Sequence, residues 1–169
     1  MKISAVHHQP QGPVFDIVLL LHVACVVVGL ATTLTSAATA TRLRKLLGGG
    51  APLPDTVARY FRPGTNWAGR GMYGIPAFGF VLLAVSHGAY GLGDGWVTVG
   101  LAIFVGVVLL AEGTLWPAER RLQVSLATYQ GGAPDTDEAR ARDAKMVVWT
   151  ASAALVLLVA GSVIMVAMP

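Results

Sequence analysis

The chain has 169 residues, of which 54% are hydrophobic and only 12% are charged. Soluble domains carry about 25% charged residues, so this composition excludes an ordinary soluble domain. The formal net charge of +3 would suit nucleic acid, but no recognised nucleic-acid-binding motif accompanies the arginines, and we expect no such partner.

Four long apolar stretches account for the charge deficit. They run approximately over residues 14–38, 72–90, 96–116 and 146–168. Each reaches or approaches the length of about 20 residues that a helix needs to cross the hydrocarbon core of a bilayer. Barrel strands instead alternate over about 10 positions, whereas these stretches are continuously apolar. The sequence therefore predicts an all-α bundle of four transmembrane helices, forming a single membrane domain over residues 1–169.

The first apolar stretch has an alternative interpretation as a signal peptide. Lys2 precedes it, and "AATAT" at residues 37–41 resembles a small-residue cleavage site. The stretch is longer than the 7–15 residues of a signal-peptide core, and its leading flank is nearly uncharged. We therefore expect a retained helix.

The basic residues indicate the orientation of the bundle. Eleven of the twelve Lys and Arg residues fall in two loops, at about 41–71 and 117–145, and the connection at 91–95 has none. The positive-inside rule then makes both loops cytoplasmic and places both termini outside. Nine arginines against three lysines favour a GC-rich bacterial genome, so the expected location is the bacterial cytoplasmic membrane.

Aromatic residues fit the same orientation. Tyr90 and Trp96 fall at the expected outer interface, and Tyr73, Trp116 and Trp149 fall at the inner one. Such belts are typical of membrane–water interfaces.

Each cytoplasmic loop contains residues with helical spacing. In the first loop Tyr60 and Phe61 share one face, with Arg59 and Arg62 beside them. Such a segment can lie on an anionic membrane surface or dock against a partner subunit, but a connector held at the interface is the interpretation that we favour. In the second loop helical spacing on both sides of a turn predicts that the third and fourth helices extend into the cytoplasm as a hairpin.

A polar stripe follows one face of the first helix. Its members are His22, Cys25, Gly29, Thr32 and Ser36, at steps of three and four residues. Small and polar residues on one face permit close approach and hydrogen bonds between helices. The stripe is therefore expected to face the bundle, where Gly161 and Met165 of the fourth helix can oppose it.

All four histidines and two of the methionines fall toward the expected outer side. His22 and His87 lie in the outer halves of two helices, and the remaining candidates for a metal are His7, His8, Met165 and Met168. Imidazole and thioether groups suit copper, and two facing histidines can ligate haem iron. No C-x-x-C or C-x-x-C-H motif supports this, so packing of hydrogen-bonded histidines is favoured over a haem or metal site, and proton or substrate handling remains a third possibility.

Glu112 is a carboxylic acid near the inner end of the third helix. An ionisable group within a span costs several kcal/mol unless it is paired or hydrated. We favour an interfacial carboxylate that reaches water over a proton relay.

Three segments resemble a known family. They are "LLHVACVVVGL" in the first helix, "FVGVVLLAEGTLWPAERRLQ" closing the third and "ALVLLVAGSVIMVAMP" at the end of the chain. Together they resemble the bacterial family of predicted integral membrane proteins called domain of unknown function 2269, through Leu21-His22, the segment Pro117 to Arg121, and Pro169. The long first loop and His87 depart from that pattern. The family has no established activity, so the resemblance implies a fold and no function.

A weaker similarity runs to copper-resistance membrane proteins and to haem-dependent membrane oxidases, which also open helices with Leu-His. It carries over to His22, with His87 as a further candidate.

Three functions compete at this point. The first is a non-enzymatic accessory or structural component of a membrane complex, in contact with lipid and with partner proteins or further copies of itself. The second is a haem- or copper-binding membrane protein that uses His22 and His87. The third is an oligomeric transporter of a small solute or ion, although no interrupted pair of helices marks a midplane site. We predict the first.

Overall fold

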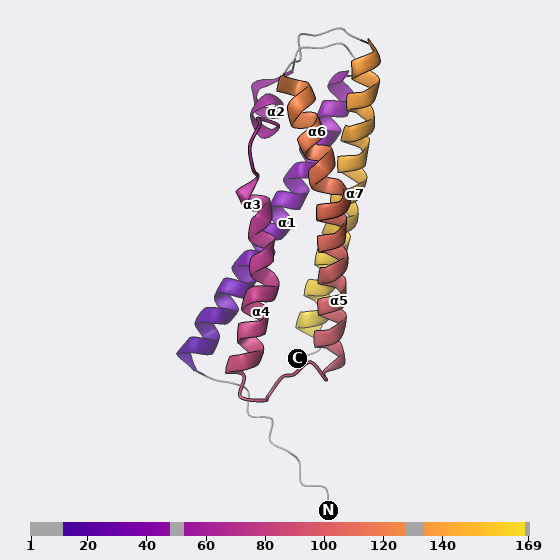
Figure 1. Cartoon of the computed structure of the whole chain (residues 1–169). Coiled ribbons are helices and arrows are strands. Elements are labelled where there is room, and N and C mark those ends of the chain that lie inside the picture. Colours follow the sequence, from indigo (N-terminus) through magenta and orange to yellow (C-terminus); the bar gives the residue numbers. More distant parts are fainter. Residues whose placement is uncertain (1–11, 48–52, 128–133, 168–169) are drawn as a thin grey trace, which may run out of the picture.

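The computed structural model describes residues 12–47, 53–127 and 134–167. Within these ranges every regular element is helical (Figure 1). The elements are α1 (Pro13–Leu47), α2 (Asp55–Tyr60), α3 (Trp67–Arg70), η1 (Gly71–Tyr73), α4 (Gly74–Val85), α5 (Gly95–Leu110), η2 (Ala111–Leu115), α6 (Trp116–Ala127) and α7 (Pro134–Ala167). Two of them are irregular, since η1 is a 3₁₀ turn and η2 is a π-helical turn.

Four helical stretches are long and apolar enough to cross a membrane. They are Pro13–Leu47, Trp67–Val85, Gly95–Ala127 and Asp137–Ala167. They form a packed bundle, which confirms the predicted all-α fold with four membrane helices. Three of the stretches continue for more than 30 residues, or more than about 45 Å of helix at 1.5 Å per residue. Because a hydrocarbon core is only about 30 Å thick, part of the bundle projects beyond the membrane.

The second stretch ends earlier than the sequence suggested. Its last helical residue is Val85, and the chain then passes through His87 (φ 51°) and Gly88 (φ 84°), which both have left-handed backbone conformations. Successive left-handed residues cannot continue an α-helix, so residues 86–94 form the connection to α5.

The helices are arranged around the pair α1 and α7. Helix α4 packs on α1, while α5 and α6 pack along α7. In Figure 1 the beginning of α1 and the end of α7 lie at the same end of the bundle as the connection between α4 and α5. Helices α2 and α6 lie toward the opposite end, where nearly all of the basic residues are found.

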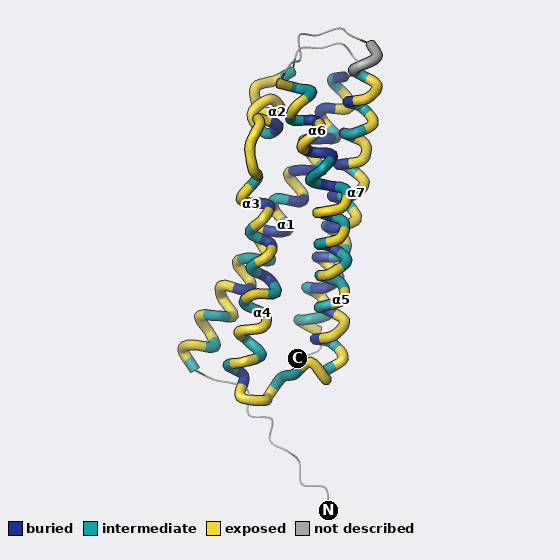
Figure 2. Tube along the Cα trace, viewed as in Figure 1, coloured by how far each residue is buried: buried dark blue, intermediate teal, exposed yellow. Residues whose placement is uncertain are grey.

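Helix α7 presents a regular buried stripe to its neighbours. The members are Arg140, Ala144, Val147, Ala151, Ala154, Leu158 and Gly161. Steps of alternately four and three residues keep them on one face, and the small side chains let the other helices approach closely. Figure 2 shows the buried positions facing inward along the long helices, with exposed positions on the outside.

Helix α2 packs against the protein's own projecting helices. Val57 and Phe61 are each only 2% exposed and belong to a core that includes Leu43 of α1, Leu122 of α6 and Val147 of α7. The apolar face that the sequence offered to a lipid surface or a partner is therefore covered internally, because α1, α6 and α7 extend past the expected membrane and supply an apolar wall. Arg59 and Arg62 remain exposed.

We predict that Phe61→Ala destabilises the protein by about 3–5 kcal/mol, the usual cost of emptying a buried phenylalanine site. Thermal unfolding of the detergent-solubilised protein measures the effect, and limited proteolysis should show earlier cleavage around α2. Arg62→Ala is the matched control, with an expected change within about 0.5 kcal/mol. Equal, small effects of both variants would show that α2 is not docked.

Close contact between α1 and α4 depends on glycines. A Cβ atom at Gly74 would overlap Cys25 Sγ, and one at Gly79 would lie 3.5 Å from the ring of His22. Gly29 of α1 similarly faces Met72 and Ile75. The two helices therefore approach one another through small residues on both sides.

We predict that Gly74→Ala lowers stability by about 1–3 kcal/mol through overpacking, and that Cys25→Ala in the same chain recovers part of the loss by removing the sulfur. Gly100→Ala is the control, because the nearest atom to its Cβ is the flexible terminal methyl of Met165, at 2.8 Å. The comparison uses melting temperatures in one detergent. An effect of Gly100→Ala as large as that of Gly74→Ala would contradict this account of the α1–α4 contact.

Candidate functional site

A buried carboxyl group joins three elements at the centre of the candidate site. Glu119 is 6% exposed and lies on the apolar face of α6, between Ala118 and Leu122 along the same buried side. Its Oε1 atom accepts a hydrogen bond from the Ser36 hydroxyl of α1. The Tyr60 hydroxyl of α2 donates to the same oxygen at 3.3 Å. One carboxyl oxygen thus holds together the helices α1, α2 and α6.

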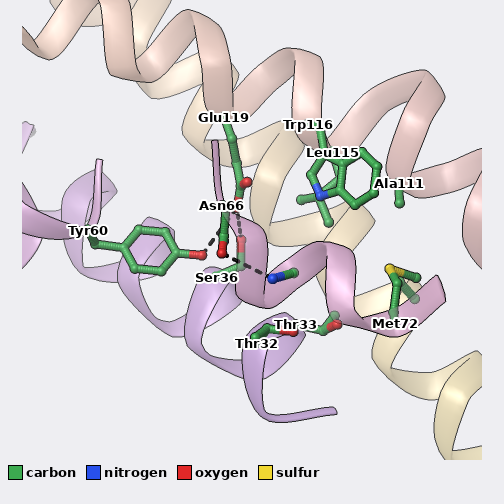
Figure 3. A pocket seen from close by; sticks show the side chains of 12 residues that line it. Thr32, Thr33, Ser36, Tyr60, Asn66, Met72, Ala111, Leu115, Trp116 and Glu119 are labelled. Carbon is green, nitrogen blue, oxygen red and sulfur yellow. Dashed lines mark hydrogen bonds between the residues drawn. The ribbon is translucent and has the colours of Figure 1, made fainter. Parts of the chain in front are cut away.

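A small cavity opens beside this carboxyl group. Figure 3 shows the side chains that surround it. The lining residues come from seven elements and are Thr32, Thr33, Ser36, Tyr60, Asn66, Gly69, Met72, Ala111, Leu115, Trp116, Glu119 and Ala154. The cavity has a volume of about 20 Å³, which is room for one or two water molecules or one small ion.

Glu119 is the one acidic residue among those that line this space. Both hydrogen bonds that its carboxyl group accepts from described residues reach Oε1, and Oε2 accepts none from a described residue. No Lys or Arg lines the cavity, and within the described ranges the ion pairs are Arg121–Asp143 and Arg140–Asp137. The cavity therefore has an acidic wall with no basic side chain on it.

The remaining polar atoms are mostly oxygens. The Thr32 and Thr33 hydroxyls donate to carbonyls of their own helix, at 2.8 Å to Val28 and 2.6 Å to Gly29, which leaves their lone pairs for a ligand. Burial raises the pKa of the Tyr60 phenol, and negative charge on Glu119 raises it further. Tyr60 is accordingly a protonated donor at neutral pH.

Asn66 completes the far wall of the cavity. Its side-chain oxygen caps α3 by accepting a hydrogen bond from the Gly69 N–H at 3.1 Å. This cap fixes the start of the second membrane stretch against α1.

A second polar cluster lies next to the cavity on the outside of the bundle. Glu112, on the π-helical turn η2, is exposed and accepts a hydrogen bond from the Tyr73 hydroxyl. The Tyr73 ring makes an edge contact with Trp116, with centroids 5.9 Å apart. The guanidinium of Arg70 lies over Trp116 at 5.5 Å and over Trp67 at 5.9 Å. Glu112 thus lies on the outer surface of the bundle, and its expected position at a membrane interface stays a prediction.

The predicted polar stripe of α1 contacts several different neighbours. His22 and Cys25 lie against α4, Gly29 lies against η1, α4 and α7, and Ser36 reaches α6. Thr32 lines the cavity. Gly161 of α7 faces Ile103 of α5 rather than α1, with 3.4 Å between an added Cβ and the isoleucine methyl.

The histidines are not brought together. His22 is buried at 7% exposure against Gly79, and its Nδ1 atom has no hydrogen-bond partner among the described residues. His87 lies eight positions beyond Gly79, in the exposed turn after α4. His22 thus lies inside the α1–α4 contact, whereas His87 lies on the exposed connection after the last residue of α4.

The other candidate metal ligands are equally dispersed. Met165 packs between α7 and Gly100 of α5, away from the α1–α4 contact. His7, His8 and Met168 lie outside the described residues. In the part of the chain that the structure describes, no group of three or more His, Cys, Asp and Glu residues could hold a metal ion.

Sequence reasoning missed Glu119 and Asn66. The signal for Glu119 was present, since Leu115, Ala118, Glu119 and Leu122 share one helical face at steps of three, one and three. A carboxyl group on that apolar face is the anomaly. Because Arg120 and Arg121 follow directly, Glu119 was interpreted as part of a solvent-exposed group of charged residues.

Comparison of the chain with family models, with curated proteins and with solved structures gave no match. The fold defines the class of protein, which is a small multi-pass membrane protein with four candidate spans.

Proposed function

We propose that the protein is a non-enzymatic membrane component that binds a small cation in the Glu119 cavity. The observation that carries the proposal is the buried carboxyl group of Glu119, which lines a small cavity without a basic residue and accepts hydrogen bonds from described residues at Oε1 alone. An uncompensated carboxylate in a low-dielectric setting is costly, and a bound cation removes that cost. Hard cations prefer carboxylate, hydroxyl and carbonyl oxygens, which are the atoms available here.

The level of the cavity in the membrane follows from the aromatic residues. Tyr90 and Trp96 are in edge contact at one end, with ring centroids 5.5 Å apart. Trp116, which lines the cavity, lies 20 positions after Trp96 on the stretch Gly95–Ala127, or about 30 Å of helix. This separation matches the thickness of a hydrocarbon core, so we place the cavity at the second interface. The positive-inside rule makes that interface the cytoplasmic one, which leaves both termini outside.

Binding is favoured over conduction by the distribution of buried polar groups. From Thr33 toward the beginning of α1, the next buried polar residue is His22, about 16 Å away along the helix. Within the described ranges no polar path joins the cavity to the opposite end of the bundle. A cation held at one interface suits an accessory component of a membrane complex, whose state is set by ion occupancy, better than a channel formed by one chain.

Two further parts of the proposal concern origin. Relationship to the family called domain of unknown function 2269 is supported by the three segments quoted above. Location in a bacterial cytoplasmic membrane is supported by the excess of arginine over lysine, nine to three.

We predict that Na⁺ stabilises the purified protein through this site. Full-length protein in detergent is melted in NaCl and in choline chloride at equal ionic strength. At a concentration ten times the dissociation constant, linkage contributes about 1.4 kcal/mol, which corresponds to a rise of a few degrees. Glu119→Gln should abolish the difference between the two salts, because it removes the charge and keeps the side-chain shape.

Glu138→Gln is the matched control, since Glu138 is an exposed carboxylate of α7 and its variant should keep the full sodium response. Two results would refute cation binding at Glu119. One is an equal melting temperature in both salts for the unmodified chain, and the other is a sodium response that survives in Glu119→Gln. A stability that follows pH and ignores Na⁺ also refutes it, because Glu119 is then simply protonated.

A further inference from the structure

Two opposite charges lie unpaired on the outside of the bundle, at the level of Trp116. Arg70 ends α3, on the second membrane stretch, and Glu112 lies on η2, within the third. Both are exposed. Among the residues that the structure describes, neither forms an ion pair. Arg70 lies over the ring of Trp116, Glu112 accepts a hydrogen bond from Tyr73, and the rings of Tyr73 and Trp116 contact each other.

The guanidinium of Arg70 is positioned by aromatic rings. It lies over Trp116 at 5.5 Å and over Trp67 at 5.9 Å. Contacts with ring faces leave the N–H groups at the edge of the guanidinium without a protein acceptor in the described ranges. A planar guanidinium held in this way is suited to bidentate binding of phosphate.

The carboxylate of Glu112 is positioned by Tyr73. The phenol donates to Oε1, and the Tyr73 ring rests edge-on against Trp116. Oε2 receives no hydrogen bond from a described residue. A carboxylate placed beside an aromatic surface at a membrane interface is suited to a primary ammonium, which supplies N–H donors and positive charge.

We propose that Arg70 and Glu112 bind the headgroup of one zwitterionic phospholipid that carries a primary ammonium, of the phosphatidylethanolamine type. The phosphate binds to Arg70 and the ammonium to Glu112, while Tyr73 and Trp116 form the floor between them. The headgroup layer is where the aromatic belt places this cluster, so the ligand is present at high local concentration. This site is separate from the Glu119 cavity, although Trp116 borders both.

The arrangement discriminates among headgroups by charge and by hydrogen bonding. A phosphatidylglycerol headgroup offers phosphate to Arg70 but no cation to Glu112, which repels its negative charge. A choline headgroup offers a cation without N–H donors. Of these three headgroups, only ethanolamine offers both a phosphate to Arg70 and N–H donors to Glu112. The other two headgroups leave Glu112 without a hydrogen-bond donor, and this difference is the source of the discrimination.

Lipid titration of the purified full-length protein tests the proposal. Short-chain lipids with ethanolamine, choline or glycerol headgroups are added in detergent, and the melting temperature gives an apparent affinity for each. We expect the ethanolamine lipid to bind about tenfold more tightly than the choline lipid, the ratio that one charge-assisted hydrogen bond supplies. Arg70→Gln should weaken binding of all three lipids, and Glu112→Gln should remove the preference for ethanolamine while improving binding of the glycerol lipid.

The controls are Arg62→Gln and Glu138→Gln, which neutralise exposed residues outside the cluster and should leave the lipid order unchanged. Because the substituted side chains are exposed, all four variants are expected to fold, and their melting temperatures without lipid verify this. Equal affinity of the unmodified chain for the three lipids overturns the proposal. So does an ethanolamine preference that persists in Glu112→Gln, or a preference for the glycerol lipid, which would indicate general attraction of anionic lipid by the basic loops.

Discussion

The architecture depends on placing one carboxyl group, Glu119, inside the junction of α1, α2 and α6. Its Oε1 atom accepts from Ser36 and Tyr60, so three elements that are distant in sequence share one acceptor. A buried acceptor is costly when its donors are lost. The two hydrogen bonds therefore tie the position of α6 to both α1 and α2. The same group supplies the acidic wall of the cavity.

The length of the helices explains why this junction exists. Helix α1, the α5–η2–α6 stretch and α7 continue well past the hydrocarbon core, and the projecting parts enclose α2 through Phe61 and Leu122. The cavity and the Arg70–Glu112 cluster adjoin each other, because Trp116 lines the cavity and also lies under the guanidinium of Arg70. The π-helical turn η2 immediately precedes Trp116. Such turns are frequent at functional sites, and here the turn carries the exposed Glu112 directly before the helix with the buried Glu119.

Much of the fold could be predicted from the sequence, and less of the site. Continuous apolar stretches fix the number and type of the membrane helices, because their length is set by the bilayer. Their ends are set by local features that hydropathy does not register, such as the left-handed turn at His87. Ser36 was selected for its place on a stripe, but its partner Glu119 lies 83 positions away, and no local pattern encodes that distance. Phe61 looked available to a partner because the projecting wall that covers it is a tertiary feature.

The most direct test of the central claim is a double-mutant cycle between Ser36 and Glu119, with unfolding free energies measured for Ser36→Ala, Glu119→Met and the double variant. A hydrogen bond to a charged group is worth about 1.5–3 kcal/mol, so the account predicts a coupling energy of at least about 1 kcal/mol. Tyr60 still donates to Glu119 when Ser36 is replaced, which keeps each single variant interpretable. Additive effects, with a coupling within about 0.3–0.5 kcal/mol of zero, would contradict the claim that this buried carboxyl group joins α1 to α6.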